Sequence, residues 1–295
     1  MPFHKKSIGS IIFDILNIII MSVVLFICII PLLHVIFASF SEPQKLLAHE
    51  GLILKPLGFT LEGYKLLFNN KEILTGTINS IIYVVSTTAL GVILTMMGGY
   101  VLSRKRFRLR NSIMLFISFT MLFSGGLIPF YLVVKSLGWV NTRLAVIVPY
   151  CLMAFNIIMM RTGFMEIPDE LEESAMLDGA NDFIILFKIY APAAKATIAV
   201  VTLLYAVSSW NSWFPAMIFL RDRSLYPIQL ILREIVESVS VQVSGGYDVI
   251  KGQLDLYQVL LQYCTMVIAT VPILIVYPFL QKYFSKGVML GSLKG

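Results

Sequence analysis

The sequence predicts an all-α, polytopic membrane protein in which six transmembrane helices form a single domain over residues 1–295. Apolar residues make up 58% of the chain and charged residues only 14%, and the apolar residues fall in runs too long for a soluble core. Between two of these runs lies a short loop with five basic residues and no acid, which is typical of a cytoplasmic loop. The three cysteines and three histidines are scattered, so neither a disulfide framework nor a metal site is indicated.

The first helix is expected at about residues 11–40. Lys5 and Lys6 precede it, as they would precede a signal peptide, but its apolar run is much longer than the roughly 7 to 15 residues of a signal-peptide core. We therefore expect an uncleaved membrane helix. Residues 41–74 are polar with balanced charges, which favours an exterior loop.

The second helix is expected at about residues 76–102. Gly91, Thr95 and Gly99 recur every four residues within it, which predicts a seam where another helix packs closely. The basic run 103–110 follows. Such a run can also bind nucleic acid or anionic lipid, but its position between two spans favours a cytoplasmic loop and no nucleic-acid partner.

Four further apolar runs supply the remaining helices, and polar stretches supply the rest of the chain. The helices are expected at about residues 113–134, 144–164, 193–220 and 259–280, the second exterior loop at 221–257 and a cytoplasmic tail at 281–295. Gly125, Gly126 and Pro129 are expected to break the third helix near its outer end. Both termini then lie in the cytoplasm, and the chain is expected in a bacterial cytoplasmic membrane.

Residues 166–192, the acidic segment, are the only long charged run in the second half of the chain. Pro168 suits the first turn of a helix, and the acids after it suit the positive end of the helix dipole. Gly179 is the permissive residue that a sharp helix end needs, and a second helix can begin at Asn181 or Asp182. The pattern predicts a helix, a bend and a second helix outside the bilayer, closed by Pro192.

The triplet Glu173-Ser174-Ala175, followed by Gly179, Ile189 and Pro192, resembles the EAA signature of the membrane subunits of ABC importers. Ser174 and Ala191 depart from the usual Ala and Leu, but both changes preserve the helix-bend-helix pattern. The resemblance implies a type I importer permease fold in which this segment is a coupling helix that docks into the cytoplasmic ATPase. An acidic amphipathic helix of another kind is the alternative. The positions that the resemblance assigns to coupling are Glu172, Glu173, Ser174, Ala175, Asp178, Gly179, Ala180 and Pro192.

Two other stretches are similar to the maltose-type carbohydrate branch of this family. Residues 224–230, SLYPIQL, look like the start of the exterior loop that reaches the solute-binding protein, especially in subunits for complex oligosaccharides. The tail resembles the Gly-rich, Lys-Gly-ending tail that inserts between the two ATPases and distinguishes this subunit from its heterodimer partner. The residues concerned are Gly287, Gly291, Lys294 and Gly295.

The chain contains no phosphate-binding loop, so it is not expected to be an enzyme. The resemblance places ATP and magnesium on partner subunits and implies no cofactor in this chain. The partners implied are a second permease subunit, different from this one, two cytoplasmic ATPase subunits and an extracytoplasmic solute-binding protein. Membrane lipid surrounds the assembly.

A translocation path needs polar residues inside the apolar spans, and aromatic rings and amides suit a sugar. The same residues can instead anchor a helix at the membrane interface or join two helices. The candidates are Asn156, Tyr205, Ser208, Trp210 and Asn211.

Together these features predict a permease subunit of an ATP-driven importer for oligosaccharides, with fragments of acidic polysaccharides as one substrate class. An importer for another solute, such as a peptide or amino acid, is one alternative. A membrane scaffold or receptor subunit without transport activity is a second. Solute-stimulated ATPase activity that appears only on co-assembly would separate these hypotheses.

Overall fold

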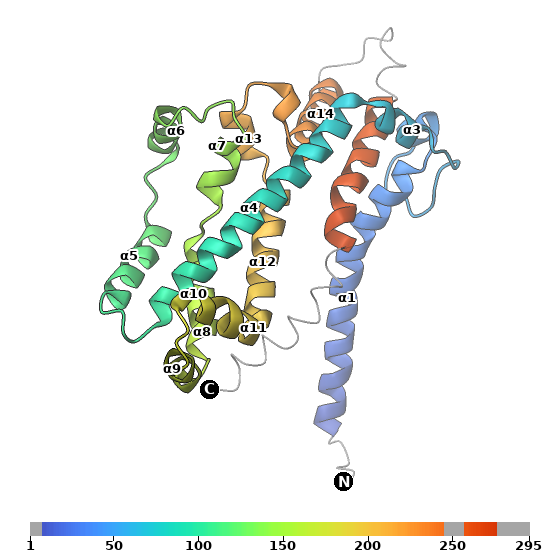
Figure 1. The fold of residues 1–295 in the computed structure, drawn as a ribbon. Coiled ribbons are helices and arrows are strands. Elements are labelled where there is room, and N and C mark those ends of the chain that lie inside the picture. Colours follow the sequence, from blue (N-terminus) through green and yellow to red (C-terminus); the bar gives the residue numbers. More distant parts are fainter. Residues whose placement is uncertain (1–7, 245–256, 276–295) are drawn as a thin grey trace. The chain divides into compact units, whose positions relative to one another are not determined.

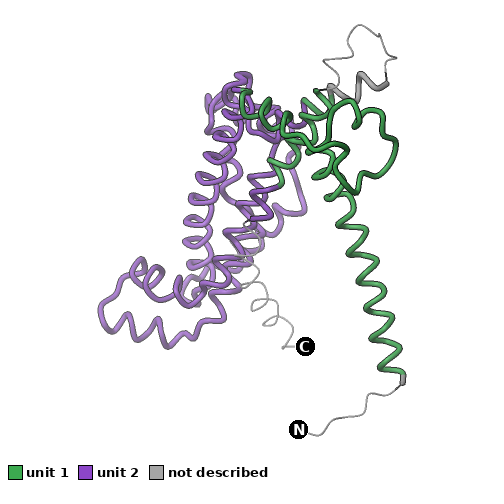
Figure 2. The backbone as a smooth tube through the Cα atoms, turned by 90° about the vertical axis from the view of Figure 1, so that its right-hand side faces the viewer, with its two compact units in different colours: residues 1–70, 235–270 green, residues 71–234, 271–295 purple. Residues whose placement is uncertain are grey.

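The computed structural model describes residues 8–244 and 257–275, and these residues are mainly helical (Figure 1). Within them, β-structure is limited to one isolated antiparallel bridge between Ser41 and Phe59. The predicted all-α class is therefore confirmed. The chain forms two compact units, Met1–Asn70 with Ile235–Thr270 and Lys71–Glu234 with Val271–Gly295 (Figure 2).

The first unit is built on the long apolar helix α1. Its helices are α1 (Ile8–Ser39), α2 (Pro43–Leu47), α3 (Glu62–Asn69), the part of α14 (Ile228–Ser244) from residue 235 on, and most of a helix at Tyr257–Ile275. Ser39 and Tyr64 share a hydrogen bond of 2.8 Å between their hydroxyls, and the Ile53 amide donates to His34 Nδ1 at 3.0 Å. These contacts fix one end of α1. The apolar stretch of α1 shows no burial within the chain, as expected for a helix that faces lipid.

The second unit contains the acidic segment and most of the core. Its helices are α4 (Lys71–Ser103), α5 (Arg110–Leu122), α6 (Leu127–Ser136), α7 (Leu144–Ile147), α8 (Ala154–Met165), α9 (Asp169–Leu177), α10 (Asp182–Ile185), α11 (Ala191–Ala193), α12 (Lys195–Trp210), α13 (Phe214–Phe219) and the start of α14. Short 3-10 helices lie at Val148–Tyr150 and Arg223–Leu225, and a π-helix lies at Leu186–Tyr190.

Three helices in the described part of the chain are long and apolar enough to cross a membrane without a break: Gly9–Ser39, Lys71–Ser103 and Tyr257–Ile275. Three bent pairs can each supply one more span. The pairs and their bends are Arg110–Leu122 with Leu127–Ser136 (116°), Leu144–Tyr150 with Ala154–Met165 (42°), and Asp182–Ala193 with Lys195–Trp210 (89°).

Two of the expected continuous helices differ from the structure. The expected helix 144–164 is interrupted between Tyr150 and Ala154, because α7 tightens into a 3-10 turn that contains Pro149 and Met153 is extended before α8. The expected helix 193–220 ends at Trp210, and a separate short helix begins at Phe214 with Pro215 in its first turn. Pro215 has no backbone N–H, so it suits a helix start better than a helix interior.

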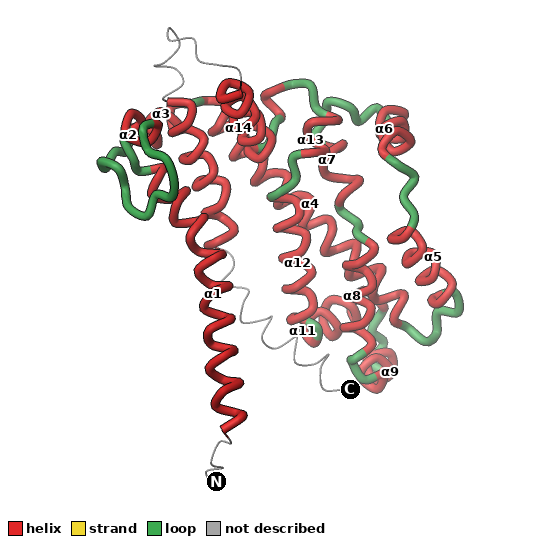
Figure 3. Tube along the Cα trace, turned by 180° about the vertical axis from the view of Figure 1, so that it is seen from behind, coloured by secondary structure: helices red, strands yellow, loops and turns green. Residues whose placement is uncertain are grey.

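The core of the second unit lies where α4, α8 and α12 pack together (Figures 1 and 3). A Cβ at Gly91 would lie 2.8 Å from the Cys151 carbonyl oxygen, and one at Gly99 would lie 2.8 Å from the Met160 side chain. The Thr95 hydroxyl is 2.7 Å from the hydroxyl of Tyr205 on α12. The predicted small-residue seam is thus confirmed as a packing surface of α4.

Candidate functional site

The acidic segment folds as a helix, a bend and a second helix, as predicted. Pro168 has extended backbone and α9 begins at Asp169, with acidic residues filling its first turn near the positive end of the helix dipole. Helix α10 begins at Asp182, and Asn181 caps it by accepting a hydrogen bond from the Ile184 amide at 2.9 Å.

The bend depends on the backbone conformation of Gly179, which has φ of +79°. Its N–H donates to the Met176 carbonyl at 3.0 Å, and the Ala180 N–H donates to the Ala175 carbonyl at 2.9 Å. These bonds close the end of α9 in the way that left-handed glycines usually do. Nothing lies within 4 Å of a Cβ built at Gly179, so the requirement for glycine is conformational and not a matter of space.

The segment is fixed to the end of α4 by a buried arginine. Arg104 is 3% exposed, and its Nη1 donates to Glu172 Oε2 at 2.6 Å and to the Tyr190 hydroxyl. Its Nη2 donates to the Phe164 carbonyl at 3.2 Å, and the guanidinium carbon lies 4.3 Å from the Tyr190 ring centre. We call Arg104, Glu172 and Tyr190 the Arg104 cluster. Because the buried charge has an ionic partner and further hydrogen bonds, the cluster can hold α9 against α4.

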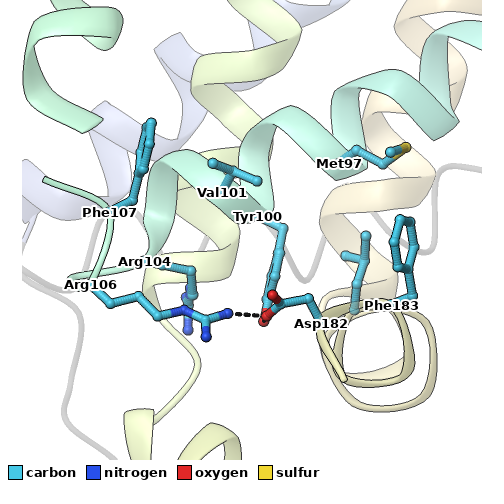
Figure 4. A pocket seen from close by; sticks show the side chains of 9 residues that line it. Met97, Tyr100, Val101, Arg104, Arg106, Phe107, Asp182 and Phe183 are labelled. Carbon is cyan, nitrogen blue, oxygen red and sulfur yellow. Dashed lines mark hydrogen bonds and ion pairs between the residues drawn. The ribbon is translucent and has the colours of Figure 1, made fainter. Parts of the chain in front are cut away.

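A second set of charges surrounds this cluster at the surface. Arg106 forms an ion pair with Asp182, which also accepts a hydrogen bond from the Tyr100 hydroxyl at 3.1 Å (Figure 4). Lys105 Nζ lies 2.6 Å from Asp169 Oδ2, and this hydrogen bond lowers the pKa of the Asp169 carboxyl below its usual range. Both pairs are exposed, so each contributes little to stability.

The basic run therefore has a role that the sequence interpretation missed. Charge alone predicted only a cytoplasmic loop, yet Arg104, Lys105 and Arg106 all contact acids of the acidic segment. The sequence did carry a signal for this contact. It contains one short run of basic residues without acids and one acidic segment, and two runs of opposite charge can pair.

The predicted coupling residues divide into two groups. Glu172 and Ala175 are buried and face the core, and Ala180 is half-buried. The other five are exposed: Glu173, Ser174, Asp178, Gly179 and Pro192. Leu177, which was not predicted, is 90% exposed at the end of α9, so the outer face of the helix is apolar as well as acidic.

The predicted substrate-path residues are brought together only in part. Tyr205 is fully buried, and its hydroxyl accepts a hydrogen bond of 3.1 Å from the Met153 amide at the break before α8. Ser208 and Tyr205 line a small pocket with Thr87, Val146, Tyr150, Met153, Ser209 and Ser212. Asn156 is buried, and its Nδ2 has no hydrogen-bond partner in the described part of the chain.

The other two candidates lie at the end of α12. Trp210 is buried, whereas Asn211 is exposed and donates to the Val207 carbonyl of its own helix at 3.0 Å. Neither they nor Asn156 line that pocket. The predicted tail residues Gly287, Gly291, Lys294 and Gly295 lie outside the described residues.

Residues 91–290 match the family described as the binding-protein-dependent transport system inner membrane component. The chain belongs to this family. It is 40% identical over 269 residues to the polygalacturonan/rhamnogalacturonan transport system permease protein YtcP of Bacillus subtilis (strain 168), covering 91% of this chain and 93% of YtcP. Protein LplC of the same strain is 38% identical over 292 residues, which cover 99% of this chain and 98% of LplC.

A solved structure gives the same result. The chain superposes with a TM-score of 0.85 and 32% identity on a chain from a bacterial ABC transporter involved in the import of the acidic polysaccharide alginate. The match covers 96% of this chain and all of that one. The resemblance to ABC importer permeases and the predicted type I permease fold are confirmed. The protein is a multi-pass membrane permease subunit and not an enzyme, and ATP hydrolysis belongs to a partner subunit.

Proposed function

We propose that this permease subunit imports oligosaccharides derived from acidic polysaccharides. The observation that carries the proposal is the agreement of two full-length likenesses, one to a polygalacturonan/rhamnogalacturonan permease and one to an alginate importer. A membrane component of a binding-protein-dependent system acts with other subunits. The partners that we propose are a different permease chain, two ATPases that carry ATP and magnesium, and an extracytoplasmic binding protein.

The outer face of α9 is the surface that we propose for ATPase docking. It presents Leu177 beside exposed Glu173 and Ser174, an apolar contact with a polar rim. The Arg104 cluster ties this helix to α4, so a displacement of α9 by the ATPase would move the end of α4. Transport by alternating access needs a connection of this kind between the ATPase and the spans.

The opposite end of α4 carries the start of the second exterior loop. Asn79 Nδ2 donates to the Ser224 carbonyl at 2.7 Å, and the Tyr83 hydroxyl donates to the Leu225 carbonyl at 2.7 Å. The Ile228 amide donates to Ser80 Oγ at 2.9 Å. These bonds support the proposal that the start of the loop presents a fixed surface to a binding protein.

We place both termini and the acidic segment in the cytoplasm. The acidic segment contacts the basic run, and short basic loops stay on the cytoplasmic side. A cysteine at Phe107, in a chain lacking Cys28, Cys151 and Cys264, should react with a membrane-impermeant thiol reagent only from the cytoplasmic side. Labelling of intact cells from outside would reverse the orientation.

Reconstitution of the complete importer tests the substrate proposal. The assembled complex, with its binding protein, is placed in nanodiscs, and ATPase activity is measured with oligogalacturonate, alginate oligosaccharide, a neutral maltooligosaccharide and a peptide mixture. We expect stimulation by an acidic oligosaccharide and little by the neutral one. Stimulation by peptides or by the neutral sugar alone would refute the substrate class, while leaving the permease assignment intact.

A further inference from the structure

A cavity of about 400 Å³ opens at the end of α4 beside the acidic segment (Figure 4). Met97, Tyr100, Val101 and Arg104 line one wall, and their spacing puts them on one face of the helix. The other walls come from the basic run and the start of α10: Arg106, Phe107, Asp182, Phe183 and Leu186. The volume is within the usual range of small-molecule sites.

Most of the cavity lining is apolar, and several of its side chains remain exposed. Phe183 is 61% exposed and Val101 is 45% exposed. The charged groups on the lining are already paired, because Arg104 contacts Glu172 and Arg106 contacts Asp182. The cavity therefore offers an apolar interior for a hydrocarbon group, with charges at one edge.

The position of the cavity relative to the bilayer suggests the source of that group. Helix α4 has 33 residues and is about 50 Å long, whereas the hydrocarbon core of a bilayer is about 30 Å thick. Charged residues lie at both ends of α4, Lys71 and Glu72 at its start and the basic run after its end, so we place its last turns at the headgroup level of the cytoplasmic leaflet. An acyl chain from that leaflet can enter a cavity at this depth.

The charge of the surrounding loop favours an anionic headgroup. Acids of the acidic segment pair with Arg104, Lys105 and Arg106. Arg108 is exposed and follows Phe107 of the cavity wall, and none of the ion pairs found within residues 8–244 and 257–275 involves it. A phosphate beside Phe107 could meet this cation, which has no ionic partner among the described residues.

From these observations we propose that the cavity is a binding site for one anionic phospholipid of the cytoplasmic leaflet. Its acyl chain lies among Val101, Phe107 and Phe183, and its phosphate contacts Arg108. Because the cavity wall includes the start of α10 and the ion pair of Arg106 with Asp182, the bound lipid would brace the acidic segment against α4. The site is independent of the solute that the importer carries.

The test uses the assembled importer and a phosphatidylglycerol that carries a photoreactive group on its acyl chain, with the phosphatidylcholine of the same chains for comparison. Cross-linked peptides are mapped by mass spectrometry. We expect phosphatidylglycerol to label residues 97–107 and 183–186. Val101→Trp should abolish this labelling by filling the cavity, while Leu115→Trp, at a 73% exposed position on α5, should keep it.

A second variant tests the headgroup without changing the cavity. Arg108→Gln should weaken phosphatidylglycerol binding about fivefold and leave phosphatidylcholine unchanged, since each cation near an anionic headgroup contributes an effect of that order. If Val101→Trp does not assemble, this result decides the proposal. Equal labelling by both lipids, full labelling of Val101→Trp, or phosphatidylglycerol labels that fall outside residues 97–107 and 183–186 would each overturn it.

Discussion

Arg104 is buried so completely that each of its neighbours matters. A guanidinium taken out of water is costly unless its charge is paired and its N–H groups are bonded, and here Glu172, Tyr190 and Phe164 meet that need. Removal of Glu172 would take away the ionic partner of the buried Arg104, and removal of Arg104 would leave Glu172 with the more distant, half-exposed Arg106 at 3.6 Å. The cluster therefore behaves as a unit, and we expect substitution of any one of its members to lower the stability of the protein strongly.

Arg104→Gln and Glu172→Gln should each destabilise the contact between α9 and α4 by about 3–5 kcal/mol, and the double variant should cost less than the sum of the two. The control is Lys105→Gln, which removes an exposed ion pair worth at most about 1 kcal/mol. Thermal unfolding of the assembled complex and solute-stimulated ATPase measure both effects. Additive losses in the double variant would contradict the cluster.

Gly179 provides a second prediction at this scale. Its φ of +79° costs a residue with a Cβ about 1–2 kcal/mol, and open space around the position removes any further steric penalty. Gly179→Leu should therefore impair transport while membrane insertion persists, and Gly179→Asn should retain more activity because asparagine tolerates this conformation. Uptake assays with membrane quantification compare the two. Equal activity of both variants with wild type would show that the bend is dispensable.

The sequence predicted Gly179 and Glu172 but not Arg104. The bend follows from local chemistry, since glycine between two helix patterns has few other uses. The ion pair joins residues that are 68 positions apart, and pairing over that separation leaves no local pattern. Leu177 was missed for a different reason, because an apolar residue in a helix is expected to be inside and this one is outside.

At the scale of helices, the spans were predictable and most of their breaks were not. Hydropathy identifies where the chain can cross a bilayer, and the glycines before Leu127 marked the break between α5 and α6. The interruptions near Pro149 and Ser212 lie inside apolar runs, and the sequence of such a run does not distinguish a kinked helix from two separate helices. A break in a helix leaves backbone groups without their helical partners, and these groups need other hydrogen bonds. At the first break the Met153 amide donates to the Tyr205 hydroxyl.

The seam of α4 allows a matched test of helix packing. Gly91→Val would put a Cβ 2.8 Å from the Cys151 carbonyl oxygen, a backbone atom that cannot move away alone, and should destabilise the complex by about 1–3 kcal/mol. Gly98→Val changes the same helix at a position with no atom within 4 Å, and should be nearly neutral. Melting temperatures of the two purified complexes give the comparison. If the Gly98→Val complex is as unstable as the Gly91→Val complex, the destabilisation comes from the loss of a glycine in general and not from a clash at the seam.

At the scale of the whole molecule, α4 is the element that both functional ends share. Near one end Asn79 and Tyr83 hold the start of the exterior loop, and at the other Tyr100 contacts Asp182 of the acidic segment. Helix α4 is continuous from Lys71 to Ser103 and packs against α8 and α12, so a displacement at one of its ends can reach the other. If the proposed binding protein and ATPase dock at these two ends, α4 gives a direct mechanical connection between them.

The C-terminal tail is the part of the whole-molecule prediction that depends on partner subunits. Residues 286–295 contain three glycines and end in Lys294-Gly295, so the chain can enter a narrow cleft but loses entropy when it does. If the tail inserts between the two ATPases, deletion of residues 287–295 should leave a complex that assembles and hydrolyses ATP, yet responds weakly to solute and imports it several-fold more slowly. The matched control replaces Gly287 and Gly291 with valine, which keeps the length but restricts the backbone, and should give an intermediate loss. Uptake per ATP hydrolysed, measured in proteoliposomes, distinguishes poor coupling from poor assembly.

Full solute-stimulated ATPase activity and full uptake by the truncated complex would show that the tail has no role in coupling. The inference of a heterodimeric pore with this chain as its tail-bearing half would then lose its main support.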